Sequence, residues 1–230
     1  GNNITQYEFG GFVDMKRNFL DEKMNLKLAL RIDKSENFKI HFSPRISALY
    51  NFNETNNIRI SVLTGFRNPG VKEQFINKDL GTARLLGGLQ QIFEPYEIAS
   101  NSIFLQNVNQ FNEAVKTDMS EGTPIGLNQA INRNMQLLAP GIVSENQLQQ
   151  LKPERVVSYE IGYKTRVGNV LFFDAVYYYS NYSNFIGIAK VVKPRTSPQV
   201  NLFTAASQVN KSAQNDIYFL NINSQENVGI

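Results

Sequence analysis

Hydrophobic and polar residues alternate along several stretches of the chain, most clearly over residues 38–52. Every second position of this stretch belongs to one set: Phe38, Ile40, Phe42, Pro44, Ile46, Ala48, Tyr50 and Phe52. The positions between them are mostly polar or basic. Because successive side chains of a strand point to opposite sides, the pattern predicts a strand with one apolar and one polar face. A strand of this length exceeds most strands of soluble proteins and is typical of a transmembrane barrel wall.

The same alternation predicts further strands that are separated by short polar turns. These strands cover roughly residues 7–16, 24–33, 58–66, 157–167, 170–180 and 216–223. The stretch 170–180 is apolar on both sides, so its register is ambiguous. We place on its apolar, outward face the set that avoids Asp174 and Ser180, namely Leu171, Phe173, Ala175, Tyr177 and Tyr179.

Two long segments, residues 68–153 and 181–215, lack this pattern and are rich in polar residues. Apolar residues recur near a helical period over 127–138, and Ser144 begins a capping-box pattern with Gln147. We therefore predict two long loops, of which the first is partly helical. Short turns that alternate with long loops are a feature of outer-membrane barrels, whose short turns lie on the periplasmic side.

These patterns predict an all-β fold of antiparallel, up-and-down strands that form part of a large transmembrane β-barrel with long, partly helical extracellular loops. Residues 1–230 are interpreted as one piece of such a barrel, with strands roughly in 4–67 and 154–230. The alternative is a soluble, secreted β-rich module that binds a ligand or a carbohydrate. That alternative would require the apolar faces to pack on one another.

The composition narrows the chemistry that the chain can perform. The formal net charge of +3 is too mild by itself to indicate nucleic-acid binding. With no cysteine and the single histidine His41, we predict no disulfide, no metal site and no cofactor. No Ser/His/Asp set or paired-carboxylate signature stands out, so we expect no enzyme activity. A hydrolase on a barrel scaffold would have to use His41 as its only imidazole base.

Basic side chains recur on the polar, lumen-facing sides of the predicted strands. The candidates are Arg31, Lys39, His41, Arg45, Arg59 and Arg67. They could form a basic lumen that attracts an anionic ligand or pairs with a plug. The simpler interpretation, which we favour, is the hydrated polar interior that any such barrel has.

Candidate ligand-binding residues come from the first long loop and from the strand end that precedes it. The loop candidates are amides: Asn107, Asn109, Gln110 and Asn112. Arg67 opens the loop, although the segment 67–70 is explained more simply as a turn built with proline and glycine. The tyrosines 177–179 could stack on a sugar, but tyrosines near strand ends more often form an interfacial aromatic belt.

Four short motifs, in this order along the chain, resemble the barrel of a TonB-dependent outer-membrane receptor. They are Phe42-Ser43-Pro44-Arg45, Gly65-Phe66-Arg67-Asn68-Pro69, Leu151-Lys152-Pro153-Glu154 and Ser158-Tyr159-Glu160-Ile161-Gly162-Tyr163-Lys164. The residues that carry the resemblance most specifically are Phe66, Arg67, Pro69, Lys152, Pro153, Glu154, Tyr159, Glu160, Gly162 and Tyr163.

This resemblance implies a receptor in the bacterial outer membrane that imports a scarce nutrient with TonB-coupled energy. The nutrient would be an iron chelate, a cobalamin-like cofactor or a glycan. The expected partners are outer-membrane lipid, the nutrient, and the TonB complex through a plug region that this sequence lacks; no nucleic acid is expected. We interpret the chain as a fragment whose outermost strands pair with a neighbouring chain or with other parts of the receptor.

Overall fold

The computed structural model describes residues 4–122, 124–168, 170–224 and 228–229. The chain divides into two compact units, and each is described by itself. The sheet unit comprises Gly1–Asn68, Lys152–Phe185 and Ser224–Ile230, and the mixed unit comprises Pro69–Leu151 and Ile186–Asn223.

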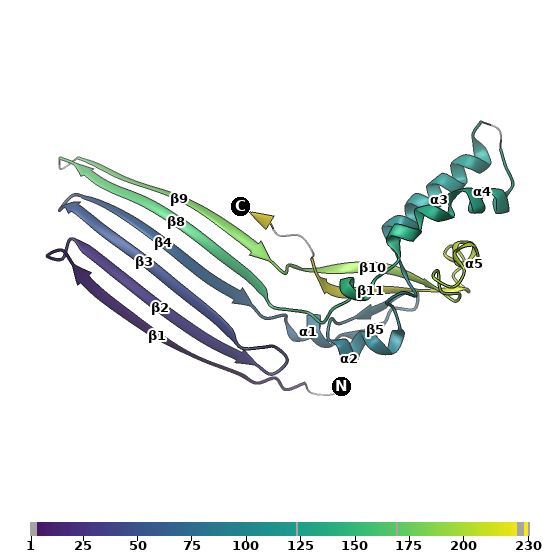
Figure 1. The fold of residues 1–230 in the computed structure, drawn as a ribbon, viewed down its shortest axis with the longest axis horizontal. Helices are drawn as coiled ribbons and strands as arrows, with labels where there is room; N and C mark the ends of the chain where they lie inside the picture. Colours follow the sequence, from purple (N-terminus) through teal and green to yellow (C-terminus); the bar gives the residue numbers. More distant parts are fainter. Residues whose placement is uncertain (1–3, 123, 169, 225–227, 230) are drawn as a thin grey trace. The chain divides into compact units, whose positions relative to one another are not determined.

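Seven strands of the sheet unit form one antiparallel sheet in the order β1-β2-β3-β4-β8-β9-β12 (Figure 1). Their bounds are β1 Glu8–Phe19, β2 Met24–Ser35, β3 His41–Asn53, β4 Asn56–Arg67, β8 Glu154–Val167, β9 Leu171–Ser183 and β12 Val228–Gly229. This confirms the predicted antiparallel strands. Among the described residues β1 and β12 are the two ends of the sheet, which does not close into a barrel.

The pairing register divides this sheet into an apolar and a polar face. One row of directly paired residues crosses six strands and is apolar throughout: Met15, Leu28, Ile46, Val62, Tyr159 and Tyr179. The adjacent row, displaced by one residue, is Asp14, Ala29, Arg45, Leu63, Ser158 and Ser180. Because paired residues share a face, the ambiguous register of β9 is settled, and Tyr177 and Tyr179 lie on the apolar face as predicted.

The long strand predicted over 38–52 is shorter at its beginning, which is a correction. Residues 36–40 form a turn, and β3 starts at His41. Phe38 is buried in this turn, where its carbonyl oxygen accepts a hydrogen bond from Lys34 Nζ at 2.5 Å. Lys39 is exposed and precedes the strand, so it does not belong to the polar strand face on which we placed it.

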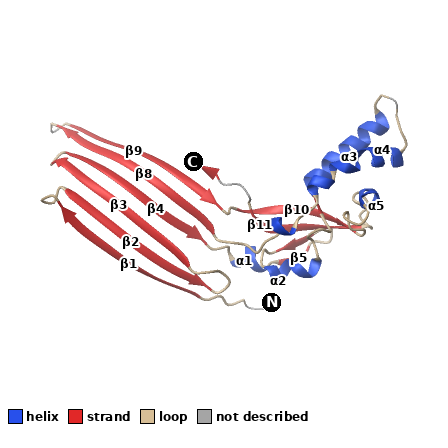
Figure 2. Cartoon of the chain, in the orientation of Figure 1, coloured by secondary structure: helices blue, strands red, loops and turns tan. Residues whose placement is uncertain are grey.

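The mixed unit has a second sheet of five short strands in the order β5-β6-β11-β10-β7. Their bounds are β5 Asn77–Asp79, β6 Arg84–Leu86, β7 Ile103–Phe104, β10 Ile186–Pro194 and β11 Asn215–Asn223. All five described α-helices belong to this unit (Figure 2): α1 Val71–Phe75, α2 Gln90–Phe93, α3 Leu105–Ser120, α4 Leu127–Asn134 and α5 Leu202–Gln208. Short 3₁₀ turns, including Glu94–Tyr96 and Glu145–Gln147, connect them. Within the described ranges no helix has the length and apolar character needed to cross a bilayer.

The loop predicted over 181–215 is wrong in part. Strand β9 continues to Ser183, and β10 occupies Ile186–Pro194. Strand β11, which we predicted as a barrel strand, pairs with β10 and β6 of the mixed unit instead. The signal for β10 was present in the β-branched pair Val191 and Val192 and in Pro194, which ends the strand, but Lys190 and Lys193 obscured the alternation.

Almost all buried hydrophobic side chains lie in the mixed unit. One cluster packs α3 and α4 around Phe111, which is 1% exposed. A second cluster is centred on Leu86, Ile98 and Leu220. Among the described residues Phe38 is the only buried hydrophobic side chain of the sheet unit. The mixed unit therefore has its own cores, whereas within the described part of the sheet unit the large sheet is a single layer with no second layer packed on it.

Candidate functional site

The polar face of the large sheet carries charges that are mostly paired. Arg31 donates hydrogen bonds to both carboxylate oxygens of Asp33, from Nε to Oδ2 at 2.8 Å and from Nη2 to Oδ1 at 2.7 Å. At the end of β4, Arg67 Nε lies 2.5 Å from Glu154 Oε2. These arginines have carboxylate partners, so the polar face is less basic than a count of its arginines indicates.

Arg59 is the centre of a third charge cluster on this face. Its Nε lies 3.2 Å from Glu160 Oε1, and its Nη2 lies 3.8 Å from Asp174 Oδ1. The guanidinium occupies the space beside Gly162, where a Cβ atom would lie 2.7 Å from Arg59 Nε. Two residues of the Ser158–Lys164 motif, Glu160 and Gly162, therefore serve to position one arginine across the β4–β8 pair.

Arg45 differs from these arginines because it has no ion-pair partner among the described residues. It borders a hollow of about 390 Å³ on the polar face. Side chains lining the hollow include Phe12, Asp14, Lys27, Ala29, Arg45, Ser47 and Leu63. Lys27 Nζ and Asp14 Oδ2 form only a loose pair at 4.0 Å. The hollow thus has two cations and one carboxylate at its rim.

His41 lies at the beginning of β3, against Phe66 of β4. The two rings stack with centroids 4.8 Å apart and an interplanar angle of 19°. The regular pairing of β3 with β4 ends at Arg45, because the next residue, Pro44, has no N–H to donate. At this point the Thr64 hydroxyl donates a hydrogen bond of 2.8 Å to the Pro44 carbonyl oxygen. The Nε2 atom of His41 is buried and has no hydrogen-bond partner among the described residues. This environment packs the imidazole as an aromatic ring against Phe66.

The remaining motif residues shape the strand ends and the apolar face. The Pro153 carbonyl accepts a hydrogen bond from Asn184 Nδ2 at 3.3 Å, and Lys152 is exposed. Tyr159 and Tyr163 project from the apolar face, where they are 51% and 40% exposed. In the mixed unit, buried Pro69 accepts a hydrogen bond from Gln74 Nε2 at 2.6 Å.

The four amides predicted to bind a ligand all lie on α3, but they do not converge. Asn112 and Asn210 exchange reciprocal amide hydrogen bonds of 2.7 and 2.5 Å. Asn107 packs against Gly141, where a Cβ would lie 2.4 Å from its Cγ. Asn109 and Gln110 are exposed. Two of the four amides therefore hold the helix in place. Arg67, the fifth candidate, belongs to the sheet unit.

A hollow of about 640 Å³ in the mixed unit was not anticipated from the sequence. Its lining comes from two segments, 90–99 and 145–150: Gln90, Phe93, Glu94, Glu97, Ile98, Ala99, Glu145, Leu148, Gln149 and Gln150. The glutamines that follow the capping box at Ser144 were the only sequence feature that pointed to a polar site here. The sequence does not show that segment 90–99, about fifty residues earlier, lies against them. No group of three or more metal-ligating side chains occurs in the part of the chain that the structure describes.

Arg84 forms a polar cluster in another part of the mixed unit. Its Nη2 lies 2.6 Å from Asp79 Oδ2, and its Nη1 donates to Asn77 Oδ1 at 3.0 Å and to the Tyr96 hydroxyl at 3.2 Å. The Tyr96 ring lies 5.5 Å from that of Tyr218. Burial raises the pKa of the Tyr218 phenol, and Asp216 and Tyr96 raise it further against a smaller lowering by Arg84. This cluster joins β5, β6 and the Glu94–Tyr96 turn.

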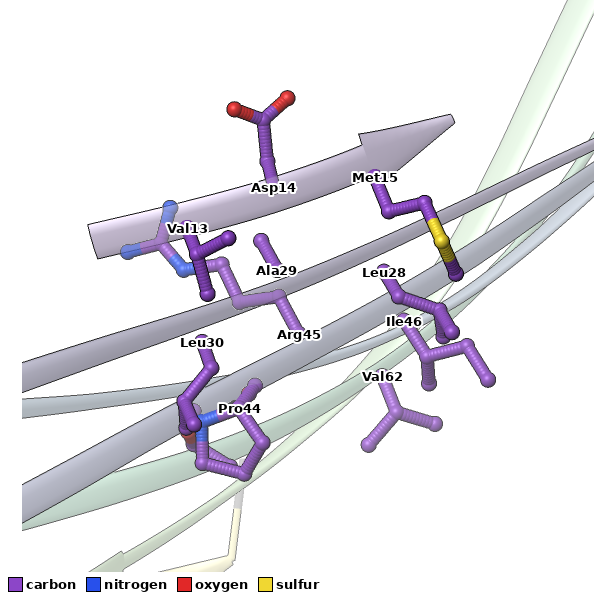
Figure 3. Close-up of a pocket in the computed structure, with 11 residues that line it drawn as sticks. Val13, Asp14, Met15, Leu28, Ala29, Leu30, Pro44, Arg45, Ile46 and Val62 are labelled. Carbon is purple, nitrogen blue, oxygen red and sulfur yellow. Dashed lines mark hydrogen bonds between the residues drawn. The ribbon is translucent and has the colours of Figure 1, made fainter. Parts of the chain in front are cut away.

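The apolar face of the large sheet has a hollow of its own, of about 480 Å³ (Figure 3). Alkyl side chains form its wall: Val13, Met15, Leu28, Leu30, Ile46 and Val62. Figure 3 shows these side chains on one side of the sheet and Asp14 pointing to the other side. The two charged residues of its lining, Asp14 and Arg45, belong by register to the row of the polar face.

Comparison with known proteins places this architecture in a family. The family model described as TonB dependent receptor-like, beta-barrel matches residues 1–230. Among solved structures, the siderophore receptor PirA from Acinetobacter baumannii is similar, with a TM-score of 0.51 and 11% identity, and the match covers 98% of this chain and 24% of that one. The siderophore receptor PirA from Pseudomonas aeruginosa gives a TM-score of 0.48 and 12% identity, covering 97% of this chain and 29% of that one.

The chain thus spans about a quarter of the length of the receptor structures that it matches. The comparison with curated proteins gave no match. The family match over the whole chain agrees with the two-faced antiparallel sheet and with the motif residues that the sheet positions. The chain belongs to the TonB-dependent receptor-like β-barrel family.

Proposed function

We propose that this chain forms part of the barrel wall, together with an extracellular loop domain, of a bacterial outer-membrane receptor. The full receptor would bind a scarce nutrient and import it with energy supplied through TonB. The sheet unit would be the wall, and the mixed unit would be the extracellular domain that first meets the ligand. The energy coupling would act through a plug region outside residues 1–230.

The observation that carries this proposal is the uncovered apolar face of the large sheet. Val13, Ile60 and Tyr177 are 65%, 51% and 69% exposed. A soluble protein with a contiguous apolar face of this extent would aggregate or bury the face in a core. In a membrane, lipid acyl chains would cover this apolar face, and water in the barrel interior would solvate the ion pairs of the opposite face. A soluble secreted module is therefore the weaker explanation, because nothing in the described sheet unit packs on this face.

The nutrient classes remain an iron chelate, a cobalamin-like cofactor or a glycan. The family itself consists of transporters, so catalysis is not required to explain the site. The description of the Acinetobacter protein as a siderophore receptor supports iron chelates as the first probe. The hollow at Arg45 and the hollow between segments 90–99 and 145–150 are two places at which a polar ligand could be held.

Uptake by the full-length receptor tests this proposal. Cells that depend on the receptor are starved of iron, cobalamin or a carbon source and are supplied with labelled iron chelates, cobalamin or oligosaccharides. We expect one class to be accumulated only when both the receptor and TonB are present. Accumulation that persists without TonB contradicts the energy coupling. Recovery of the protein as a soluble monomer without detergent contradicts the membrane location.

A further inference from the structure

The alkyl hollow of the apolar face lies near a single cation of the same face. Arg17 follows Met15 by two residues on β1, so its side chain points to the same side of the strand. The register pairs Arg17 with Leu26 and Met15 with Leu28, and both leucines belong to the apolar face. Among the described residues no carboxylate lies within ion-pair distance of Arg17. Its guanidinium carbon lies 5.3 Å from the centroid of the Phe19 ring.

Aromatic residues mark the level of the sheet at which Arg17 lies. The paired row next to it, nearest the short turns, contains Phe19, Tyr50 and Tyr163 on the apolar face. Aromatic side chains at the end of an otherwise aliphatic band are typical of the boundary between hydrocarbon and head groups. Arg17 therefore lies at head-group level, and the hollow, whose lining on β1 begins two residues away at Met15, lies between Arg17 and the middle of the sheet.

We propose that this groove binds one anionic phospholipid, with its phosphate on Arg17 and one acyl chain in the alkyl hollow. The proposal rests on the membrane location in the proposed function. Charge complementarity selects the head group, because Arg17 has no carboxylate partner among the described residues and its guanidinium fits phosphate geometry. The hollow selects the chain, since the apolar-face part of its lining includes Val13, Met15, Leu28, Leu30, Ile46 and Val62.

The dimensions agree with this occupant. Four residues separate Arg17 from Val13, which corresponds to about 14 Å along an antiparallel strand. Because barrel strands tilt by about 35–45°, this distance covers about 10 Å along the membrane normal, and half of the hydrocarbon core is about 15 Å. A chain that passes Arg17 and follows the hollow as far as Val13 would therefore cover about two thirds of one leaflet. Because the short turns are on the periplasmic side in our proposal, the lipid would come from the inner leaflet.

The test compares lipid retention by the full-length receptor in nanodiscs of phosphatidylglycerol and phosphatidylcholine. Native mass spectrometry counts the lipids that stay bound after transfer to detergent. We expect the wild type to retain one phosphatidylglycerol in preference to phosphatidylcholine. Arg17→Gln should lower that preference about fivefold, the factor expected for one arginine at an anionic membrane surface. Val13→Trp should reduce retention of both lipids by filling the hollow.

Two matched variants serve as controls. Arg155→Gln removes a cation of the same face at the far end of the strands, and Ile161→Phe enlarges an apolar-face residue outside the hollow. Both should retain phosphatidylglycerol like the wild type. The proposal is overturned if Arg17→Gln keeps the preference or if Arg155→Gln loses it equally. A receptor that inserts and imports its nutrient without an Arg17-dependent lipid refutes only this inference, whereas a protein that stays soluble refutes the proposed function itself.

Discussion

The guanidinium of Arg59 occupies the space that a side chain at residue 162 would need. A Cβ atom on Gly162 would lie 2.7 Å from Arg59 Nε and 3.0 Å from its Cγ. The absence of a side chain at Gly162 thus allows Arg59 to reach Glu160 and Asp174, two carboxylates on the neighbouring strands β8 and β9. This relationship gives a physical reason for a glycine in the centre of a strand, where glycine is otherwise unfavourable.

Gly162→Ala should therefore destabilise the sheet, because Arg59 must move away from its carboxylate partners. We expect a loss of about 1 kcal/mol in the free energy of unfolding, at the low end of overpacking effects, since an arginine side chain can adjust. Gly11→Ala is the matched control, as a Cβ there would meet no atom within 4 Å. Thermal unfolding of the full-length receptor in detergent measures both. Equal midpoints for the two variants would contradict this role of Gly162.

A lysine introduced on β3 should destabilise the protein much more on the apolar face than on the polar face. Ile46→Lys places a cation on the apolar face and should cost about 2–4 kcal/mol if that position lies near the bilayer midplane. Ser47→Lys places it on the polar face, directly opposite Lys27, and should cost less, about 1 kcal/mol or below. Folding of the full-length receptor into lipid vesicles, followed by its resistance to denaturation in detergent, measures the difference. Similar losses for both variants would argue against a lipid-facing side at Ile46.

The helical part of the mixed unit should depend on Phe111 and not on the exposed amide of Gln110 on the same helix. Phe111→Ala removes a side chain that is 1% exposed and should cost about 3–5 kcal/mol. Gln110→Ala, its exposed neighbour, should change stability by less than about 0.5 kcal/mol. Hydrogen exchange of the α3 amides in the full-length receptor reports both values. Unchanged protection in Phe111→Ala would contradict the packing of this core.

Stability of the mixed unit should decline in alkaline solution because of Tyr218. Burial raises the pKa of its phenol above the ordinary value of 10.0, so the folded state retains the proton over a range in which the unfolded state has lost it. The resulting stabilisation is complete below the unfolded pKa and is lost as the pH rises through the folded pKa. Urea unfolding across this range should show a steeper decline for the wild type than for Tyr218→Phe. Parallel declines would exclude Tyr218 as the cause.

The sequence alone predicted most strands of the large sheet and their two faces, because the alternation of apolar and polar residues is a local pattern. Side chains alternate with a period of two, so a two-faced strand can be recognised from consecutive residues such as those from His41 to Phe52. The same period indicated the apolar face of β9, and the cross-strand register confirmed it. The family motifs were recognisable for the same reason, since each lies within one strand or at one strand end.

Only the tertiary structure decided which strands belong together and which charges are paired. Strand β11 alternates like a barrel strand, yet β10 and β6 are its partners, and β6 is far from it in the sequence. Arg31, Arg59 and Arg67 looked alike along the chain as basic residues, but only Arg31 has a local partner, Asp33, two residues away on the same strand. Arg59 and Arg67 meet carboxylates of other strands through strand register, and Arg59 also uses the space left by a glycine. Strand partners and ion pairs between strands depend on contacts between distant segments, and local periodicity carries no information about those contacts.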